Sequence, residues 1–203
     1  MTVAALSGGK DSTAMLHLLI KQGKTPDRVY FFDTEWEFPC MYEHLNMVER
    51  KTGLHIEKIR SYRPFDDLLL YHGWPKTSGG WCSARKRDVS VVYERAVKTD
   101  VVYIGFSADE VSRAEKPTLH KIRKWKVGFP LIEAGMSERD CLRYCLDLGY
   151  HWNGLYEHIS RVSCFCCPKA GKSRLQFLQE RFPELYAETL RKQAQGQSKE
   201  VGG

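Results

Sequence analysis

The sequence predicts an α/β fold: an open, mostly parallel sheet with helices on both faces, followed by a small C-terminal helical extension that carries cysteines. Short, nearly continuous apolar runs alternate with longer segments of helical periodicity, as expected for strands that are covered on both faces. The first apolar run leads through a glycine-rich turn directly into a helix. This order implies parallel strands that are joined by right-handed crossovers.

The alternation of strands and helices predicts element bounds. Gly23 and Gly53 are expected to end the first two helices. Residues 64–80 are less regular and predict a short helix and a mobile loop. We expect strands at residues 3–6, 29–32, 54–59 and 101–104, and helices from about Ser12, over residues 39–51 and over residues 85–98.

The character of the chain changes after Pro130. A helix over residues 137–148 begins with Ser137 and Asp140 in capping-box spacing, and a final helix is expected over residues 173–192. The rest is rich in Gln, Ser and Gly, which predicts disorder. We therefore expect an α/β domain over residues 1–135, a helical and cysteine-bearing segment over 136–192 and a disordered tail over 193–203.

Composition narrows the class of protein. The 203 residues are 42% hydrophobic and 28% charged, which excludes a disordered chain or a fibrous repeat. The sequence contains no run of about 18 apolar residues and no secretory segment, so we expect a cytoplasmic protein without a membrane partner. The net charge of +6 favours polyanionic ligands such as nucleotides.

The glycine-rich turn has the chemistry of a phosphate site. It reads Ser7-Gly8-Gly9-Lys10-Asp11-Ser12 between the first strand and the first helix. Backbone N–H groups and the positive end of the helix point to one place there, and Lys10 adds a fixed charge. The Walker spacing of glycines and lysine is absent, which disfavours a P-loop NTPase.

This hexapeptide resembles the SGGxDS signature of the PP-loop superfamily, whose members cleave ATP between the α and β phosphates or bind a sulfonucleotide. Further blocks resemble the phosphoadenosine phosphosulfate (PAPS) reductase family, so that the similarity covers roughly residues 1–190. These blocks are residues 31–34, residues 81–83 with Lys86, residues 105–110 with Arg113, residues 129–133, and residues 153–156 leading through Arg161 to the cysteines.

The resemblance implies roles for individual residues. Asp33 and Thr34 would lie near the base or ribose, Asp109 and Glu110 would hold magnesium, and Arg113 would clamp a phosphate. For any one of these residues, a solvated acidic turn or a surface arginine is the alternative. The implied nucleotide-binding set is Ser7, Gly8, Gly9, Lys10, Asp11, Ser12, Asp33, Thr34, Gly105, Asp109 and Glu110, and the implied catalytic set is Lys10, Asp11, Lys86 and Arg113.

One departure from the family concerns the reaction. Its true sulfonucleotide reductases carry a catalytic cysteine in a short C-terminal Cys-Gly-Leu-His motif, whereas no cysteine follows Cys167 here. The thiol that attacks the sulfonyl sulfur is therefore missing. This favours ATP-dependent adenylylation coupled to sulfur transfer over reduction.

The seven cysteines predict a metal or cluster site, because an odd number in a cytosolic chain does not suggest a disulfide framework. The resemblance favours a 4Fe–4S cluster on Cys82, Cys164, Cys166 and Cys167. A cluster on three of these thiols, a zinc ion on the same thiols with His151 or His158, and merely buried thiols are the alternatives. We expect Cys40, Cys141 and Cys145 to pack in the core.

The densest basic stretch surrounds Trp125. Such a basic stretch is most often a solvated loop, but basic residues interleaved with an aromatic residue can also bind the phosphates of a nucleic-acid strand and stack a base. The stretch follows the Asp109 to Arg113 block directly, so we expect an acceptor bound there to lie near the nucleotide. Its cationic residues are Lys116, His120, Lys121, Arg123, Lys124 and Lys126.

Three functions are compatible with these observations. The leading one is a PP-loop transferase that uses ATP, Mg²⁺ and a 4Fe–4S cluster, with a sulfur donor such as a cysteine desulfurase, a nucleic-acid or small-molecule acceptor, and a homodimeric assembly. The second is a PAPS or adenylylsulfate reductase whose thiol is Cys166 or comes from a partner. The third is a non-catalytic nucleotide-binding module with structural zinc.

Overall fold

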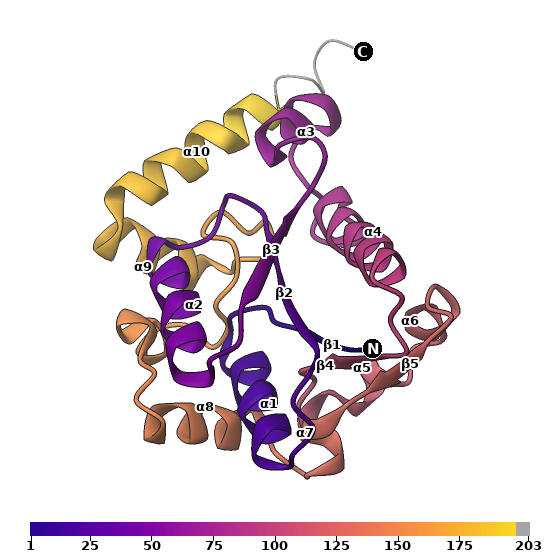
Figure 1. The fold of residues 1–203 in the computed structure, drawn as a ribbon. Coiled ribbons are helices and arrows are strands. Elements are labelled where there is room, and N and C mark those ends of the chain that lie inside the picture. The colour runs from indigo at the N-terminus through magenta and orange to yellow at the C-terminus, as the bar shows by residue number, and fades with distance from the viewer. Residues whose placement is uncertain (198–203) are drawn as a thin grey trace. The chain divides into compact units, whose positions relative to one another are not determined.

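The computed structural model describes residues 1–197 and confirms the predicted fold class. Five parallel strands form one sheet in the order β3-β2-β1-β4-β5 (Figure 1). The strands are β1 (Thr2–Ala5), β2 (Arg28–Asp33), β3 (Ile56–Arg60), β4 (Val101–Ile104) and β5 (Lys126–Gly128).

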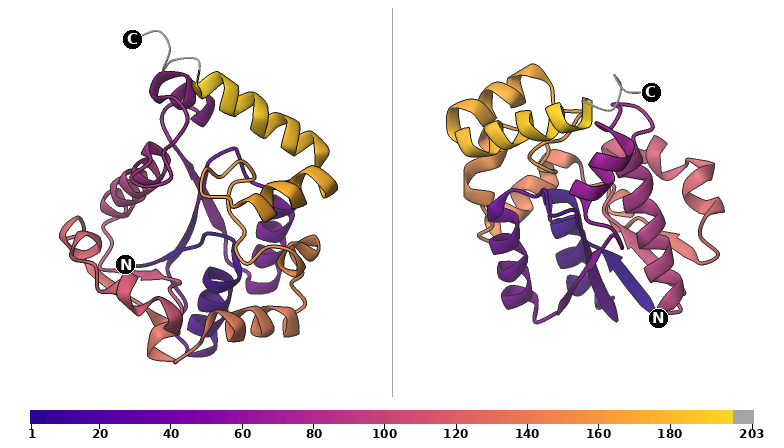
Figure 2. Two further views of the ribbon diagram at one scale, coloured as in Figure 1. Left: turned by 180° about the vertical axis from the view of Figure 1, so that it is seen from behind. Right: turned by 90° about the horizontal axis from the view of Figure 1, so that it is seen from above.

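The first two crossovers, α1 and α2, lie on one face of the sheet, and the last turns of α4 lie on the other (Figure 2). This placement follows from right-handed connections, because the chain moves outward from β1 to β3 and then returns to β4. The helices are α1 (Lys10–Lys21), α2 (Pro39–Thr52), α3 (Phe65–His72), α4 (Trp81–Ala96), α5 (Val111–Ala114), α6 (Pro117–Lys121), α7 (Pro130–Glu133), α8 (Glu138–Asp147), α9 (Lys172–Arg181) and α10 (Pro183–Gln197), with the 3-10 helices η1 (Ala108–Glu110) and η2 (Trp152–Glu157).

The C-terminal helix differs from the prediction. A break before Pro183 divides the expected single helix into α9 and α10, because proline has no N–H to donate inside a helix. The expected disorder from residue 193 is wrong for residues 193–197, which continue α10. Residues 198–203 lie outside the described part. β5 was not predicted, because it is three residues long and only Gly128 is buried in it.

The chain forms two compact units whose limits do not follow the predicted boundary at residue 135. The first unit, called here the sheet unit, contains residues 1–32, 40–59 and 90–153. The second, called here the cysteine unit, contains residues 33–39, 60–89 and those from Gly154 onward. Each unit is described by itself below.

The core of the sheet unit consists of the strands and the inward faces of α1, α2 and α8. Ser137 and Asp140 form the predicted capping box at the start of α8. Cys141 and Cys145, one turn apart on that helix, are fully buried, and Cys40 is buried as well, which confirms them as core residues. The fully buried apolar side chains include Val3, Met15, Leu16, Leu19, Val48 and Val102.

The cysteine unit is built around three aromatic rings. Trp36, Phe65 and Trp81 pack edge to face, with ring centroids 5.2 to 6.1 Å apart. α10 runs from α9 to α3 (Figure 2), and its buried Lys192 forms an ion pair with Asp66 of α3. Within residues 1–197, none of the helices is both long and apolar enough to span a membrane.

Candidate functional site

The glycine-rich turn connects β1 to α1 in the sheet unit. Gly8 adopts a φ of +75°, a left-handed conformation that favours glycine. The Ser12 hydroxyl closes the turn, because it accepts a hydrogen bond from the Ser7 N–H at 3.0 Å and donates to the Gly9 carbonyl at 3.1 Å. The two serine hydroxyls lie 2.9 Å apart. Both predicted serines therefore shape the turn.

The start of α1 is suited to an anion. Gly9 is its N-cap residue and has no side chain that could occupy the N–H groups of the first turn. Gly105, directly after β4, packs against the same turn: a Cβ added there would lie 2.7 Å from the Ser12 Cα and 2.9 Å from the Ser12 N. The predicted glycine is thus needed for close backbone approach.

Lys10 is almost completely buried at the start of α1. Its Nζ lies 2.8 Å from Glu138 Oε2 and 3.1 Å from Asp11 Oδ2. Burial alone would lower the pKa of Lys10, but the hydrogen bond to Glu138 and the charge of Asp11 raise that pKa above its ordinary value. The ammonium group therefore keeps its charge. Glu138 was not among the predicted site residues.

The two carboxylate oxygens of Asp11 have different surroundings. Its Oδ1 is buried without a hydrogen-bond partner within residues 1–197, whereas Oδ2 pairs with Lys10. Burial raises the pKa of Asp11, the charge of Lys10 lowers it, and the negative charges of Glu138 and Glu110 raise it further. A buried carboxylate oxygen without a partner is suited to a cation, and magnesium commonly takes one or two carboxylates together with substrate phosphates.

Asp109, Glu110 and Arg113 lie in the same unit, but each already has a partner. Asp109 Oδ2 accepts the Glu138 N–H at 2.7 Å and so caps α8, while Arg113 forms an ion pair with Glu110. The Arg113 guanidinium also lies 4.3 Å from the centre of the Phe106 ring. Their assignment to magnesium and phosphate stays a prediction.

The turn is supported from behind by an indole and an imidazole that were not predicted as site residues. Trp152 Nε1 donates to the Gly8 carbonyl at 2.8 Å, and the His44 ring stacks on the indole at 4.5 Å. Burial lowers the pKa of His44 to about 3, so the ring is neutral and can hydrogen-bond Thr13 Oγ1 at 3.0 Å. Trp152 has a φ of +44°, which the surrounding contacts must stabilise.

Asp33 and Thr34, which were expected near the nucleoside, belong to the cysteine unit and are buried. Asp33 Oδ2 accepts two hydrogen bonds from Arg60, at 2.7 and 3.0 Å. Thr34 Oγ1 donates to Glu37 Oε1 at 2.6 Å and lies 3.3 Å from Cys164 Sγ. Thr34 is therefore part of the surroundings of the cysteines, and its nucleoside role stays a prediction.

The predicted cysteines gather around Lys86. Lys86 Nζ lies 3.7 Å from Cys164 Sγ. Burial alone would lower the pKa of Lys86, but the charges of Cys164, Glu37, Cys82 and Cys167 raise it above its ordinary value. Three of the four predicted thiols therefore lie within electrostatic reach of one ammonium group.

Arg174 of α9 is the second cation at the cysteines and was not predicted. Its Nη2 donates to the Cys164 carbonyl at 2.9 Å, and its Nε is buried without a hydrogen-bond partner within residues 1–197. Burial raises the pKa of Cys164 to about 12, with a further contribution from the charge of Glu37. Cys166 is the most buried thiol of the group, and burial raises its pKa too.

Several thiols, two cations and an unpaired buried N–H are suited to a negatively charged, sulfur-rich group such as an iron–sulfur cluster. Within residues 1–197, however, no three His, Cys, Asp or Glu side chains are arranged as ligands of one metal ion. The 4Fe–4S cluster and the zinc alternative both stay predictions.

Comparison with known proteins identifies the family. Residues 1–170 match the phosphoadenosine phosphosulfate reductase domain. The chain belongs to the PAPS reductase domain family. It is 30% identical over 193 residues to an uncharacterized protein of Methanocaldococcus jannaschii, a match that covers 91% of this chain and 39% of that protein. The chain thus spans about two fifths of the length of this curated relative.

Two solved structures share the fold of this PAPS reductase domain. The U34-tRNA thiolase NcsA from Methanococcus maripaludis, solved with its 4Fe–4S cluster, superposes with a TM-score of 0.55 at 17% identity, covering 94% of this chain and 70% of that one. The NH3-dependent NAD synthetase from Campylobacter jejuni has a TM-score of 0.51 at 17% identity, covering 96% and 84%.

The basic stretch of this family member is divided by the fold. Arg123 is buried and bonds Glu94 at 2.7 Å, so it is not part of an exposed basic surface. Lys126 pairs with Val101, which in turn pairs with Thr2, at the amino ends of the strands. The glycine-rich turn follows the carboxyl end of β1. The expectation that this stretch lies near the nucleotide is therefore wrong for Lys124 to Lys126.

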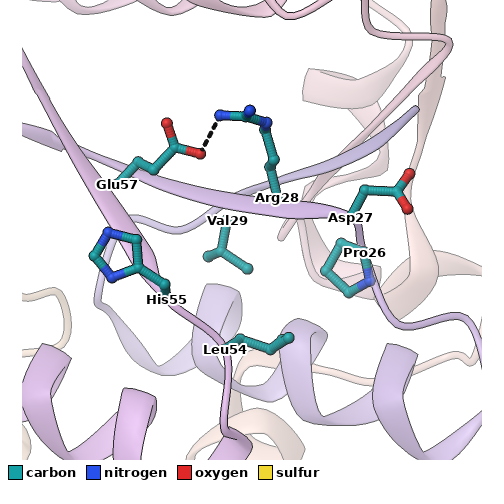
Figure 3. Close-up of a pocket in the computed structure, with 7 residues that line it drawn as sticks. All are labelled: Pro26, Asp27, Arg28, Val29, Leu54, His55 and Glu57. Atoms are coloured by element: carbon teal, nitrogen blue, oxygen red, sulfur yellow. Dashed lines mark hydrogen bonds and ion pairs between the residues drawn. The ribbon is translucent and has the colours of Figure 1, made fainter.

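The amino edge of the sheet also contains a cavity of about 460 Å³ between β2 and β3 (Figure 3). Arg28 Nη1 and Glu57 Oε1 form an ion pair 2.8 Å long at its rim. Because this pair neutralises the arginine, the cavity lacks the unopposed charge that an anion requires. Its lining consists of Pro26, Asp27, Arg28, Val29, Leu54, His55 and Glu57.

Proposed function

We propose that this chain is an ATP-pyrophosphatase-type enzyme that adenylylates an acceptor and couples this step to sulfur transfer at its cysteines. The observation that carries the proposal is the start of α1: a glycine-capped helix end with the charged Lys10 beside it and a free carboxylate oxygen on Asp11. Membership of the PAPS reductase family supports an adenine nucleotide as the ligand.

The proposed first step breaks the bond between the α phosphorus and the bridging oxygen to the β phosphate. An acceptor oxygen attacks the α phosphorus, and pyrophosphate leaves with the electron pair of the broken bond. The N–H groups at the start of α1 and the Lys10 ammonium would stabilise the charge that develops on pyrophosphate. For this, Lys10 must exchange its contact with Glu138 for a phosphate oxygen.

Sulfur would then enter as hydrosulfide, whose sulfur attacks the activated carbon of the acceptor and displaces AMP. This step needs no oxidant or reductant, because the sulfur is already at the sulfide level. A cysteine desulfurase would instead deliver a persulfide sulfur, and an external thiol would then have to reduce it, with formation of a disulfide. The protons released by the acceptor and by hydrosulfide would pass to solvent water.

Cys82, Cys164 and Cys167 would hold a 4Fe–4S cluster beside Lys86, with Cys166 as the fourth thiol of the predicted set. Such a cluster would supply soft, Lewis-acidic iron for binding sulfur. Lys86 and Arg174 would offset the negative charge of the thiolates, and Thr34 would orient Glu37. The thiolase of similar fold, which acts on tRNA and carries this cluster, makes a nucleic-acid acceptor a reasonable first choice.

The family match also favours a second candidate, a sulfonucleotide reductase. Its attacking thiol would have to come from a partner, because Cys166 is 1% exposed and burial raises its pKa, so that little thiolate forms. Incubation with PAPS and a thioredoxin system distinguishes the two candidates. Release of sulfite would support the reductase function and would exclude the sulfurtransferase function.

The nucleotide assignment is tested by pyrophosphate release from ATP with Lys10→Ala. Anaerobically purified protein is supplied with sulfide and candidate acceptors, and we expect the variant to lose release while it keeps the circular dichroism spectrum of the wild type. Lys24→Ala, an exposed lysine near the other end of α1, is the matched control. Full activity of Lys10→Ala would show that the phosphate assignment is wrong.

The cysteine assignment is tested by metal analysis and ultraviolet-visible spectra of anaerobically purified protein. We expect iron and inorganic sulfide, with a broad band in the blue region, and loss of both in Cys82→Ser and Cys164→Ser but not in Cys40→Ala. Stoichiometric zinc without iron would instead support a structural zinc site. If, in addition, no acceptor elicited pyrophosphate release, the non-catalytic module would replace the enzyme.

A further inference from the structure

A second cavity at the amino edge of the sheet has the charge that the first one lacks. It has a volume of about 380 Å³ and lies in the sheet unit between the end of α4 and the start of β5. Arg95, Lys98, Thr99, Lys124 and Trp125 line it, so that three cations and one aromatic ring face it without a carboxylate among the lining residues.

The three cations are free to bind a ligand. Arg95, Lys98 and Lys124 are exposed, and none of them forms an ion pair or a side-chain hydrogen bond in the part of the chain that the structure describes. Asp100, which lies two residues after Lys98, pairs with the amino group of Met1. The cavity therefore has a net positive charge that only a ligand or counterions can offset.

Trp125 is held by a buried network. Its Nε1 donates to Glu94 Oε2 at 2.9 Å, and the fully buried Glu94 also accepts from Tyr30 at 2.7 Å and from Arg123 at 2.7 and 3.0 Å. Arg123 already balances the charge of Glu94, so this carboxylate does not neutralise the cavity. The network fixes the edge of the indole and thereby orients the ring at the cavity.

The positive charge extends along the chain beyond the cavity. Lys116, Lys121 and Lys126 are exposed; Lys121 is the last residue of α6, and Lys126 is the first residue of β5. A single mononucleotide would engage the cavity alone, whereas a strand can also follow the neighbouring cations. Single-stranded binders combine cations along the backbone with aromatic rings on which bases stack.

We propose that this cavity anchors a single-stranded nucleic acid, with phosphates on Arg95, Lys98 and Lys124 and a base stacked on Trp125. Because the cavity lies at the amino ends of the strands and the glycine-rich turn lies at the carboxyl end of β1, the cavity is distinct from the proposed nucleotide site. The proposal concerns binding alone, so it holds or fails independently of the proposed chemistry.

The charge part is tested by fluorescence anisotropy of a labelled single-stranded oligonucleotide of about 12 residues, measured without ATP. The double variant Lys98→Glu with Lys124→Glu should lose affinity by roughly tenfold or more at low salt. The double variant should also reduce the magnitude of the slope of log K against log salt concentration, where K is the association constant, by about 1.4. Each of the two lost phosphate contacts contributes about 0.7 to this slope. Lys21→Glu with Lys24→Glu makes the same change in net charge at two exposed lysines that do not line the cavity, and this variant should lose less than about threefold in affinity.

The stacking part is tested at Trp125. Trp125→Leu should weaken binding by roughly fivefold to a hundredfold, and Trp125→Phe, which keeps a ring, should recover most of that loss. Circular dichroism verifies that both variants are folded. Recovery by phenylalanine separates stacking from the structural contact with Glu94, because both variants lack the indole N–H.

The following results would overturn the proposal. They are no binding by the wild type, equal losses in the cavity variant and the Lys21 and Lys24 control, equal affinities of the leucine and phenylalanine variants, and complete competition by millimolar AMP or inorganic phosphate. The last result would identify a site for a free nucleotide or phosphate. A duplex of the same length that bound as tightly as the single strand would likewise exclude base stacking.

Discussion

Gly105→Ala tests whether the start of α1 is held in place by β4. The added Cβ would lie 2.7 Å from the Ser12 Cα, 2.9 Å from the Ser12 N and 3.1 Å from the Asp11 carbonyl carbon. All three are backbone atoms, so no flexible side chain can move away. Ordinary contact begins at 3.4 Å, which means that the first turn of α1 must shift by up to about 0.7 Å.

Two consequences follow from this shift. Overpacking of this kind typically costs about 1–3 kcal/mol in the free energy of unfolding, which lowers Tm by roughly 2–12 °C for a chain of this size. The N–H groups of the same turn would also move away from the phosphates, and the loss of one hydrogen bond to a charged group, worth about 1.5 kcal/mol, corresponds to roughly a tenfold loss of nucleotide affinity.

Differential scanning fluorimetry and titration calorimetry with ATP and magnesium measure the two effects separately. Gly171→Ala is the matched control: its φ is −71° and its added Cβ would have no neighbour within 4 Å. An unchanged Tm for Gly105→Ala would refute the packing argument. A lowered Tm with unchanged ATP affinity would refute the placement of the phosphates at α1.

Three further predictions concern buried groups of the sheet unit. Trp152→Phe removes the donor to the Gly8 carbonyl and should lower the free energy of unfolding in urea by about 0.5–1.5 kcal/mol. Glu94→Gln leaves the buried Arg123 guanidinium without a counter-charge and should cost about 3–5 kcal/mol in the same assay. His44 has a pKa of about 3 in the folded protein, against an ordinary value of 6.5, so the unfolded chain takes up the His44 proton at a higher pH than the folded protein does. The contribution of His44 to the free energy of unfolding should therefore be complete above pH 6.5 and should decline toward pH 3, by at most about 1.4 kcal/mol per pH unit. His44→Gln should remove this part of the pH dependence.

The controls for these variants come from the same unit. Glu115→Gln changes an exposed carboxylate and should alter the free energy of unfolding by less than about 0.5 kcal/mol. A Glu94→Gln variant as stable as this control would contradict a role for the carboxylate in holding Arg123. An equally steep pH dependence in wild type and His44→Gln would contradict a neutral, buried His44.

The strands and most helices could be predicted because their signals are local. Apolar runs and glycine stops depend on neighbouring residues, and the capping box at Ser137 located the start of α8 correctly. The prediction missed β5 because this strand is too short to show an alternating pattern. Its strand conformation depends on pairing with β4, which the local sequence does not reveal. The helix break at Pro183 was detectable in principle, since the residue before a proline is biased away from helical geometry.

The sequence predicted only those residues of the candidate site that belong to the continuous motif itself. The glycine-rich turn is continuous in sequence, so its serines, glycines and lysine could be identified together. Glu138 and Trp152 act on that turn from more than 100 residues away. Their contacts exist only because α8 packs on α1 and the first residue of η2 returns to the turn, which no local pattern encodes.

The basic stretch shows why a run of charge cannot be assigned to one surface. Arg123 and Lys124 are adjacent in sequence, yet Arg123 is buried against Glu94 while Lys124 lines a cavity. Glu94 lies 29 residues earlier, on α4, so its pairing with Arg123 is a tertiary contact. One cation therefore stabilises the core and the next is available to a ligand.

In the proposed nucleotide site, the partners of Lys10 would keep its charge available for a polyanion. An ammonium group that is 4% exposed would be costly without partners, and Glu138 and Asp11 supply them. A phosphate that displaces Glu138 replaces one anion with another, so the charge balance around Lys10 is conserved. Glu138 is 35% exposed and can turn to solvent once released. The exchange requires the rotation of one surface side chain and leaves the N–H groups of α1 where they already are.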